Sequence, residues 1–126
     1  MKGTPYLNFD GNCEEAMRFY ADCLQAEVQV RLEGRRVLHA YVTKGGLTIM
    51  GSDCPTGMAI VPGTNFYVCL ECESPAEQDR VFAALGEGGT VTMPLQISHW
   101  DARFGMLTDQ FGTHWMFNDL DATKEA

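Results

Sequence analysis

Apolar and polar residues alternate one by one in eight short stretches of the chain, and this period of two predicts strands. Four stretches lie in the first half, at residues 4–9, 26–33, 35–44 and 47–53. The other four lie in the second half, at residues 65–71, 89–98, 102–109 and 113–119. Glycines at 34, 45, 46 and 112 predict turns between them. Pro94 has no backbone N–H, so its strand is expected at a sheet edge or at a bulge.

Two other stretches repeat their apolar residues at three- and four-residue intervals, which predicts helices. The apolar face of the first consists of Ala16, Phe19, Tyr20 and Cys23. The apolar face of the second consists of Val81, Phe82 and Leu85. Asn12 is the expected N-cap of the first helix and Ser74 that of the second, with Pro75 in the first helical position and Glu77 closing a capping box. Gly86 is expected to end the second helix.

The order of these elements is the same in both halves, strand, helix and then three strands. Each half opens on Gly-Thr, at residues 3–4 and 63–64. We therefore predict an α+β fold, in which two βαβββ modules form a curved mixed sheet around a central cleft. The expected division is module one at 1–53, a Pro- and Gly-containing linker at 54–62, module two at 63–119 and a tail at 120–126, all within one domain of residues 1–126.

Three motifs carry a resemblance to a known family. They are "PYLNFDGNCEEAMRFY", "HAYVTKGGLTIMGSD" and "HWDARFGMLTDQFGTHWMFN". With them the chain resembles the vicinal oxygen chelate superfamily, which includes glyoxalase I, fosfomycin-resistance proteins, extradiol dioxygenases and bleomycin-binding proteins, and within it the PhnB-like branch. The resemblance implies the glyoxalase/bleomycin-resistance fold and a homodimer.

The resemblance also indicates where a metal would bind in metal-dependent relatives, which take one ligand from the first strand of each half and a glutamate from the last strand. These positions correspond to Thr4, Asn65 and Met116, and Pro5 would serve no better than Thr4. A hydroxyl, a neutral amide and a thioether do not form a site for Ni, Zn, Mn or Fe. We expect no metal and no cofactor.

Members of this branch are often labelled 3-demethylubiquinone methyltransferase. A methyltransferase of that kind needs a glycine-rich loop that follows a strand and precedes a helix. The glycine-rich segment "GEGGTV" at 86–91 follows a predicted helix and enters a predicted strand, which is the opposite order. We therefore do not expect methyl transfer.

Strand alternation also predicts which side chains face the cleft. The residues expected to pack under the helices are Leu7, Phe9, Leu38, Ala40, Val42, Phe66, Val68, Leu70, Trp115 and Phe117. The expected ligand-binding residues are Tyr6, Asn8, His39, Tyr41, Asn65, Tyr67, Trp100, His114 and Met116. Trp100 and the preceding His99 belong to a loop that could form a lid or a dimer contact. His114 and His39 are the candidate general bases, although a strand histidine more often serves as a structural hydrogen-bonding group.

Charge and cysteine content narrow the class of partner. The net charge of the 126-residue chain is -8, which argues against nucleic acid and against an anionic membrane surface. No apolar run could span a bilayer and no signal-peptide core is visible, so we expect a cytoplasmic protein with free thiols at all five cysteines. Cys69 and Cys72 are expected on opposite faces of one strand, which disfavours a redox or zinc role, and Cys13 at a helix start should have at most a slightly lowered thiol pKa.

Three functions remain open. The leading hypothesis is metal-free binding of a small organic ligand in the cleft. The alternative is an enzyme of the lyase, isomerase or dioxygenase type that uses a histidine base, or a metal at a non-standard site. The third is a protein without a ligand, whose cleft closes in a dimer.

Overall fold

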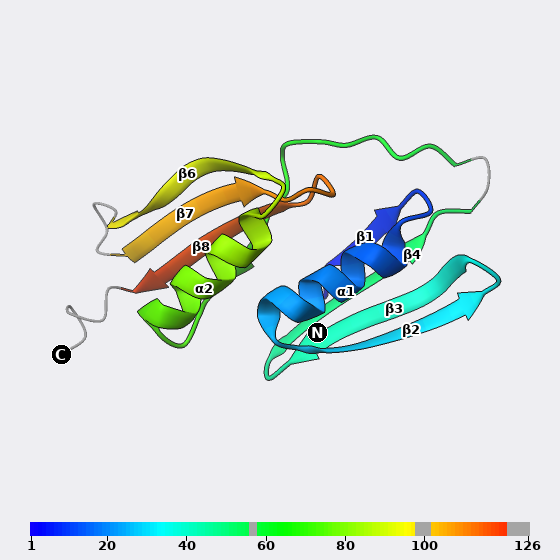
Figure 1. Ribbon diagram of the computed structural model, residues 1–126, viewed down its shortest axis with the longest axis horizontal. Helices are drawn as coiled ribbons and strands as arrows, with labels where there is room; N and C mark the ends of the chain where they lie inside the picture. Colours follow the sequence, from blue (N-terminus) through cyan, green and yellow to red (C-terminus); the bar gives the residue numbers. More distant parts are fainter. Residues whose placement is uncertain (56–57, 98–101, 121–126) are drawn as a thin grey trace. The chain divides into compact units, whose positions relative to one another are not determined.

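The computed structural model describes residues 1–55, 58–97 and 102–120, and it has the predicted α+β fold with two mixed four-stranded sheets and one helix beside each (Figure 1). The chain divides into two compact units, Met1–Val61 and Pro62–Ala126. Each unit contains one βαβββ module. Within the described residues, no helix is long and apolar enough to cross a membrane.

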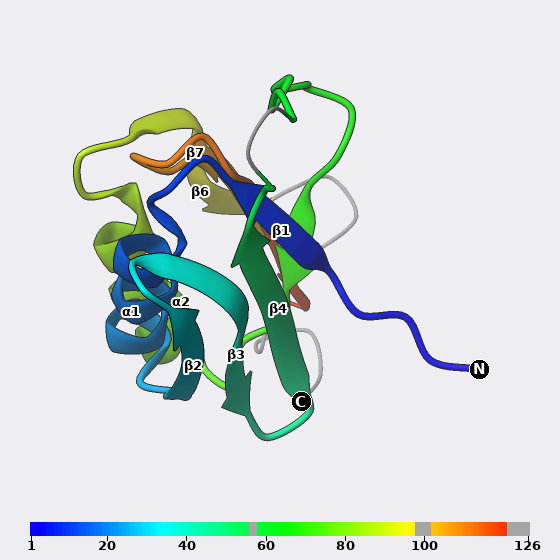
Figure 2. The same cartoon turned by 90° about the vertical axis from the view of Figure 1, so that its right-hand side faces the viewer.

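The first unit builds its sheet from the four predicted strands of the first half. Its elements are β1 (Tyr6–Phe9), α1 (Cys13–Leu24), β2 (Glu27–Glu33), β3 (Arg36–Lys44) and β4 (Leu47–Asp53). The strand order is β1-β4-β3-β2, with β1 parallel to β4 and the other pairs antiparallel. The helix α1 packs along one face of β2, β3 and β4 (Figure 2).

The second unit repeats this arrangement. Its elements are β5 (Val68–Leu70), α2 (Pro75–Gly86), β6 (Thr90–Ile97), β7 (Ala102–Thr108) and β8 (His114–Leu120). The strand order is β5-β8-β7-β6, with β5 parallel to β8. Pro94 lies in β6, which is an edge strand with a register shift between Met93 and Gln96, where the proline lies, as its missing N–H predicted.

The first helix begins at a carboxylate from a distant strand. Asn12 occupies the N-cap position, but its side chain makes no capping hydrogen bond. Instead, the buried Asp53 at the end of β4 accepts the backbone N–H of Cys13 at 3.0 Å and that of Val37 at 2.9 Å. One carboxylate thus satisfies a free helix N–H and joins α1 to β3 and β4.

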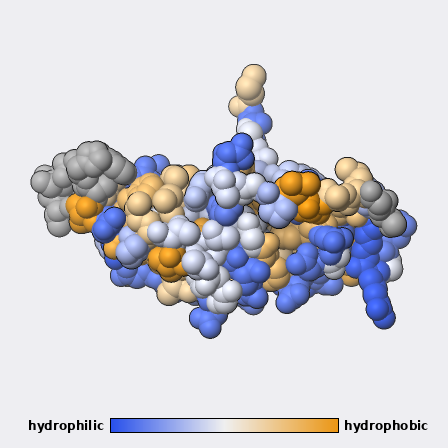
Figure 3. All heavy atoms as spheres, turned by 90° about the horizontal axis from the view of Figure 1, so that it is seen from above, coloured by the Kyte–Doolittle hydropathy of each residue, from blue (hydrophilic) through white to orange (hydrophobic). Residues whose placement is uncertain are grey.

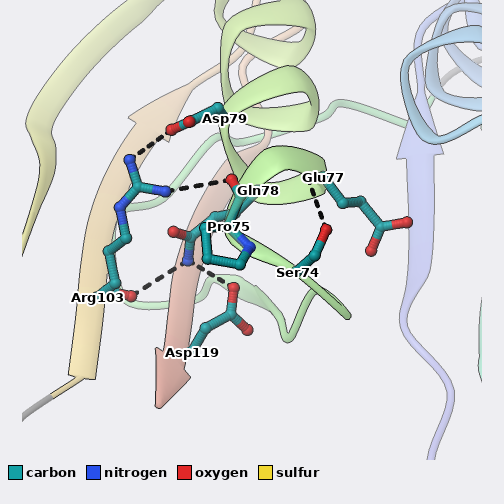
Figure 4. A network of polar contacts seen from close by, with 7 residues as sticks. All are labelled: Ser74, Pro75, Glu77, Gln78, Asp79, Arg103 and Asp119. Atoms are coloured by element: carbon teal, nitrogen blue, oxygen red, sulfur yellow. Dashed lines mark hydrogen bonds and ion pairs between the residues drawn. The ribbon is translucent and has the colours of Figure 1, made fainter. Parts of the chain in front are cut away.

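The second helix begins with the predicted capping residues. Ser74 Oγ accepts the backbone N–H of Glu77 at 3.1 Å, and Pro75 is the first helical residue. The Glu77 carboxylate accepts the N–H of Glu73 at 2.9 Å, one residue before the cap, so the capping box closes one position earlier than predicted. In the first turn of α2, the side-chain amide of Gln78 donates hydrogen bonds to the Asp119 carboxylate at 2.6 Å and to the Arg103 carbonyl of β7 (Figure 4).

Each helix buries its apolar stripe on its own sheet. Fully buried side chains include Met17, Tyr20, Leu85, Trp115 and Phe117. Phe19, a predicted core residue, is only half-buried, and Met17 takes the central position. On the face drawn in Figure 3, strongly hydrophobic residues form small separate areas among hydrophilic ones.

Two predicted core residues lie elsewhere. Phe66 is 62% exposed because it precedes β5, which begins only at Val68. Leu38 is half-buried, and the preceding Val37 is buried instead. A β-bulge explains the second difference, because the register shifts between Arg31 and Leu32 and the alternation changes phase there.

Candidate functional site

Each sheet has one face turned away from its helix, which we call the first open face and the second open face. The sides of the strands are assigned by burial and register, since paired residues of neighbouring strands share a face. The first open face carries Tyr6, Asn8, Gln29, Arg31, His39, Tyr41, Met50 and Ser52. The second open face carries Tyr67, Cys69, Phe104, Met106, Thr108, His114, Met116 and Asn118.

Aromatic rings form a continuous chain on the first open face. The ring of His39 lies 5.9 Å from that of Tyr6, in a stacked arrangement with 30° between the planes. On its other side, His39 lies 6.1 Å from the ring of Tyr41. Met50 is the register partner of both tyrosines, so its thioether lies on the same face between them. Three predicted ligand-binding residues are thus brought together.

His39 keeps one ring nitrogen available. The Tyr6 hydroxyl lies 3.4 Å from Nδ1, and either group can be the donor, depending on the histidine tautomer. Nε2 makes no hydrogen bond within the described part of the chain. The imidazole of His39 can therefore contact a ligand or move a proton at Nε2 without losing a structural hydrogen bond.

His114 on the second open face has both nitrogens engaged. Nε2 lies 2.8 Å from the carbonyl oxygen of Gly63, which can only accept, so Nε2 carries the proton. Nδ1 lies 2.8 Å from Thr108 Oγ1, and in that tautomer it accepts a hydrogen bond from the Thr108 hydroxyl. The ring also contacts Tyr67, with 5.2 Å between centroids. His114 would have to break one of these bonds to serve as a base.

A buried carboxylate holds the turn that precedes β8. Asp109 Oδ1 accepts the backbone N–H groups of Phe111 and Thr113 at 2.8 and 3.1 Å. Its Oδ2 accepts the indole N–H of the fully buried Trp115 at 2.8 Å. Because Trp115 lies between His114 and Met116 in the strand, Asp109 fixes the register of the second open face. This geometry is typical of a turn aspartate, whose side chain accepts hydrogen bonds from backbone N–H groups a few residues on.

The residues that the resemblance assigns to the family's metal positions do not supply the donors that a metal ion prefers. Thr4 and Met116 are half-buried and Asn65 is exposed, so these positions offer a hydroxyl, a thioether and an amide. The neighbouring His114 has no free lone pair while its two hydrogen bonds persist. Among the residues that the structure describes, no three His, Cys, Asp or Glu side chains form a group that could hold a metal.

The cysteines differ from expectation in two respects. Burial, aided by the charges of Asp53 and Glu14, raises the pKa of the Cys13 thiol to about 12, whereas its position at a helix start had predicted at most a slight lowering. Cys72 lies outside β5, so the argument from opposite faces of one strand does not apply to it. Cys69 is exposed as a residue, but partial desolvation of its sulfur, followed by the charges of Glu71 and Asp119, raises its thiol pKa. Neither thiol is activated as a nucleophile.

The remaining predicted site residues are less informative. Asn65 precedes β5, Asn8 is exposed on β1, and Trp100 with its lid or dimer role lies outside the described residues. The sequence interpretation missed Arg31, Met50, Phe104 and Met106. Alternation within residues 47–53 and 102–108 would have assigned the last three to the open faces, because Ile49 and Leu107 are the buried members of those strands.

Comparison with known proteins places the chain among characterised folds. A family model described as 3-demethylubiquinone-9 3-methyltransferase matches residues 1–117. The crystal structure of protein PA1353 from Pseudomonas aeruginosa is similar, with 34% identity, a TM-score of 0.85 and coverage of 95% of this chain and 98% of that one. A PhnB protein from Bacillus cereus is 29% identical with a TM-score of 0.77, covering 94% and 99% of the two chains.

A more distant structure shares the fold alone. It is the bleomycin resistance determinant encoded on the transposon Tn5, which is 16% identical with a TM-score of 0.64 and covers 96% of this chain and 98% of that one. The βαβββ repeat deduced from the sequence is therefore the repeat of a known fold.

Proposed function

This chain belongs to the family described as 3-demethylubiquinone-9 3-methyltransferase, the PhnB-like branch of the vicinal oxygen chelate superfamily, and on that premise we propose that it binds a small organic ligand without a metal. The observation that carries the proposal is the aromatic chain of Tyr6, His39 and Tyr41 on the first open face. Aromatic surface with a few convergent polar groups is typical of small-molecule sites. The Tn5 protein with the same fold is named for bleomycin resistance, which is compatible with a sequestering role here.

Methyl transfer is not part of the proposal, despite the description of the family. The segment 86–91 runs from the end of α2 into β6, whereas a cofactor loop of the dinucleotide type runs from a strand into a helix. Its glycines have a structural explanation as well. Gly88 has a positive φ of 74°, and a Cβ on Gly89 would collide with the backbone oxygen of Thr108.

A thermal-shift screen of small organic compounds tests the proposal. A ligand present at 100 times its Kd adds about 2.7 kcal/mol to the unfolding free energy, which such a screen detects. We expect the shift produced by a hit to disappear in His39→Asn and to persist in His114→Asn, the matched change on the second open face. If no compound stabilises the protein, or if both variants respond as the wild type does, the ligand-binding proposal is wrong.

Enzyme activity is the second candidate, and the available Nε2 of His39 favours it. In that case His39, rather than His114, would act as the general base, with the Tyr6 hydroxyl orienting its ring through Nδ1. A compound that binds and is slowly converted would identify the reaction. We expect His39→Gln to abolish that conversion even at compound concentrations that saturate the variant, and conversion that survives this change would exclude the role.

Assembly belongs to the same proposal. We expect a homodimer in solution, and light scattering of the purified protein measures it directly. A monomer at all accessible concentrations would contradict this expectation.

A further inference from the structure

The cationic side chain of Arg31 lies on the first open face, beside the rings of Tyr6, His39 and Tyr41. Arg31 on β2 is the register partner of His39 on β3, so the two side chains share this face with their Cβ atoms about 5 Å apart. Arg31 is exposed, and no carboxylate contacts it within the described residues. Its guanidinium is therefore free to bind an anion on a ligand that lies over His39.

The acidic residues near Arg31 do not cancel its charge at this position. Glu33 follows on the same strand, but its register partner is Arg36. Glu27 lies at the other end of β2, opposite Thr43. The row that crosses the centre of the face, Gln29, Tyr41, Met50 and Tyr6, has no charged side chain.

The net charge of the chain is distributed unevenly between its units. Residues 1–61 contain six basic and seven acidic residues, whereas residues 62–126 contain three basic and ten acidic residues. The first unit therefore carries a net charge of -1 and the second a net charge of -7. The acidity of the whole chain does not predict a cationic guest on the first open face.

Resting on the proposed function, we infer that the ligand of the first open face is a planar aromatic anion. Its ring stacks against Tyr6, His39 and Tyr41, and its carboxylate or an equivalent planar anionic group accepts hydrogen bonds from the guanidinium of Arg31. Offset stacking on these rings accounts for affinity, because the centroids of neighbouring rings lie 5.9 and 6.1 Å apart and offer adjoining aromatic surfaces. The fork of N–H donors on Arg31 accounts for selectivity, because it matches the geometry of a carboxylate.

Isothermal titration with four matched probes tests the ligand class. The probes are 1-naphthoate, neutral 1-naphthalenemethanol, cationic 1-naphthylmethylammonium and non-aromatic cyclohexanecarboxylate. We expect 1-naphthoate to bind most tightly, by about twofold to fivefold over the neutral alcohol, which is the range of one exposed charge-assisted contact. The cation and the non-aromatic acid should each bind more weakly than the alcohol.

Two arginine substitutions locate the anionic group. Arg31→Gln should remove the preference for 1-naphthoate over the alcohol and leave the affinity for the alcohol within about twofold of wild type. Arg35→Gln is the matched control, since it removes the same charge from the turn of the same hairpin, outside the paired strands. Tyr41→Leu should weaken all three naphthyl probes by about threefold to tenfold, because it removes one stacking surface.

The outcomes separate this inference from the proposed function. Tighter binding of the cation than of the anion, or equal effects of the two arginine substitutions, would overturn the inference. The same holds if no naphthyl probe binds while the thermal-shift screen yields a hit that depends on His39, in which case ligand binding itself stands. If neither the probes nor the screen yields binding, both proposals fail.

Discussion

Replacing Asp109 by asparagine should destabilise the protein strongly, although the change removes no side-chain volume. The Asp109 carboxylate accepts three hydrogen bonds, from the backbone N–H groups of Phe111 and Thr113 and from the indole of Trp115. Asparagine offers one oxygen and one NH₂ group. If the oxygen keeps the two backbone donors, the NH₂ group faces the indole N–H, and two donors confront each other.

The size of the loss follows from burial. Trp115 is fully buried and Asp109 is 4% exposed, so water cannot replace the missing acceptor. A hydrogen bond to a charged group contributes about 1.5–3 kcal/mol, and a buried unsatisfied donor costs about 1–3 kcal/mol. Since these two contributions overlap, we expect Asp109→Asn to lower the unfolding free energy by about 2–4 kcal/mol. That is a large part of the roughly 5–15 kcal/mol that holds an ordinary domain together.

Urea unfolding followed by tryptophan fluorescence measures the loss, and a double-mutant cycle assigns it. Trp115→Phe removes the indole N–H and retains an aromatic ring. In that background, Asp109→Asn should cost at least about 1 kcal/mol less than in the wild type. If the two costs simply add, within about 0.5 kcal/mol, the hydrogen bond to the indole is not what Asp109 contributes.

Three further predictions concern backbone strain at Gln25, steric contact at Gly89 and the titration of Asp119. Gln25 ends α1 with a left-handed φ of 52°, so Gln25→Gly should raise the unfolding free energy by about 0.5–1 kcal/mol, and Gln25→Ala, which keeps a Cβ, should give no gain in urea unfolding. Gly89→Ala should lower the unfolding free energy by more than about 2 kcal/mol, because the new methyl group would collide with the backbone oxygen of Thr108. Gly46→Ala is the control, since a methyl group there has no neighbour within 4 Å. Equal melting temperatures of the two variants would contradict the close approach of Gly89 to Thr108. Burial raises the pKa of Asp119 above its ordinary 3.8, and Glu71 and Glu77 add to this, outweighing the hydrogen bond from Cys72 and the charge of Arg103. A raised carboxyl pKa means that the folded state binds the proton of Asp119 more tightly than the unfolded state does. Protonation of Asp119 therefore stabilises the fold at low pH, and this stabilisation is lost as pH rises above 3.8. The stability of Asp119→Asn relative to wild type should therefore rise as pH increases above 3.8, and a pH-independent difference in denaturation midpoints would refute this sign.

The architecture was largely predictable from the sequence because its elements are amphipathic in regular periods. Alternation located all eight strands, and the apolar stripes with Ser74 and Pro75 located both helices. These signals are local, and tertiary context did not override them. The first strand of the second half was predicted too long. Val68 pairs with Trp115 and β8 begins at His114, so Phe66 would lie opposite the turn and has no strand partner there.

The candidate site was less predictable, because its key features depend on which strands are neighbours. Arg31 and His39 meet only through the pairing of β2 with β3, and the bulge between Arg31 and Leu32 shifts the phase that had assigned Leu38 to the core. The engaged state of His114 depends on a carbonyl 51 residues earlier in the chain. Side-chain alternation indicates a face, but it does not identify the hydrogen-bond partners that decide whether a histidine is available.

The aspartates at the ends of β4 and β8, Asp53 and Asp119, also constrain the order in which the two halves fold. Asp53 reaches back 40 residues to Cys13, and Asp119 reaches back 47 residues to Cys72. Contacts of such long range close late, because the intervening chain must first be ordered. During synthesis, Asp53 is translated before any residue of the second unit, so the N-terminal half can complete its native bonds as a nascent chain while the second half still awaits Asp119.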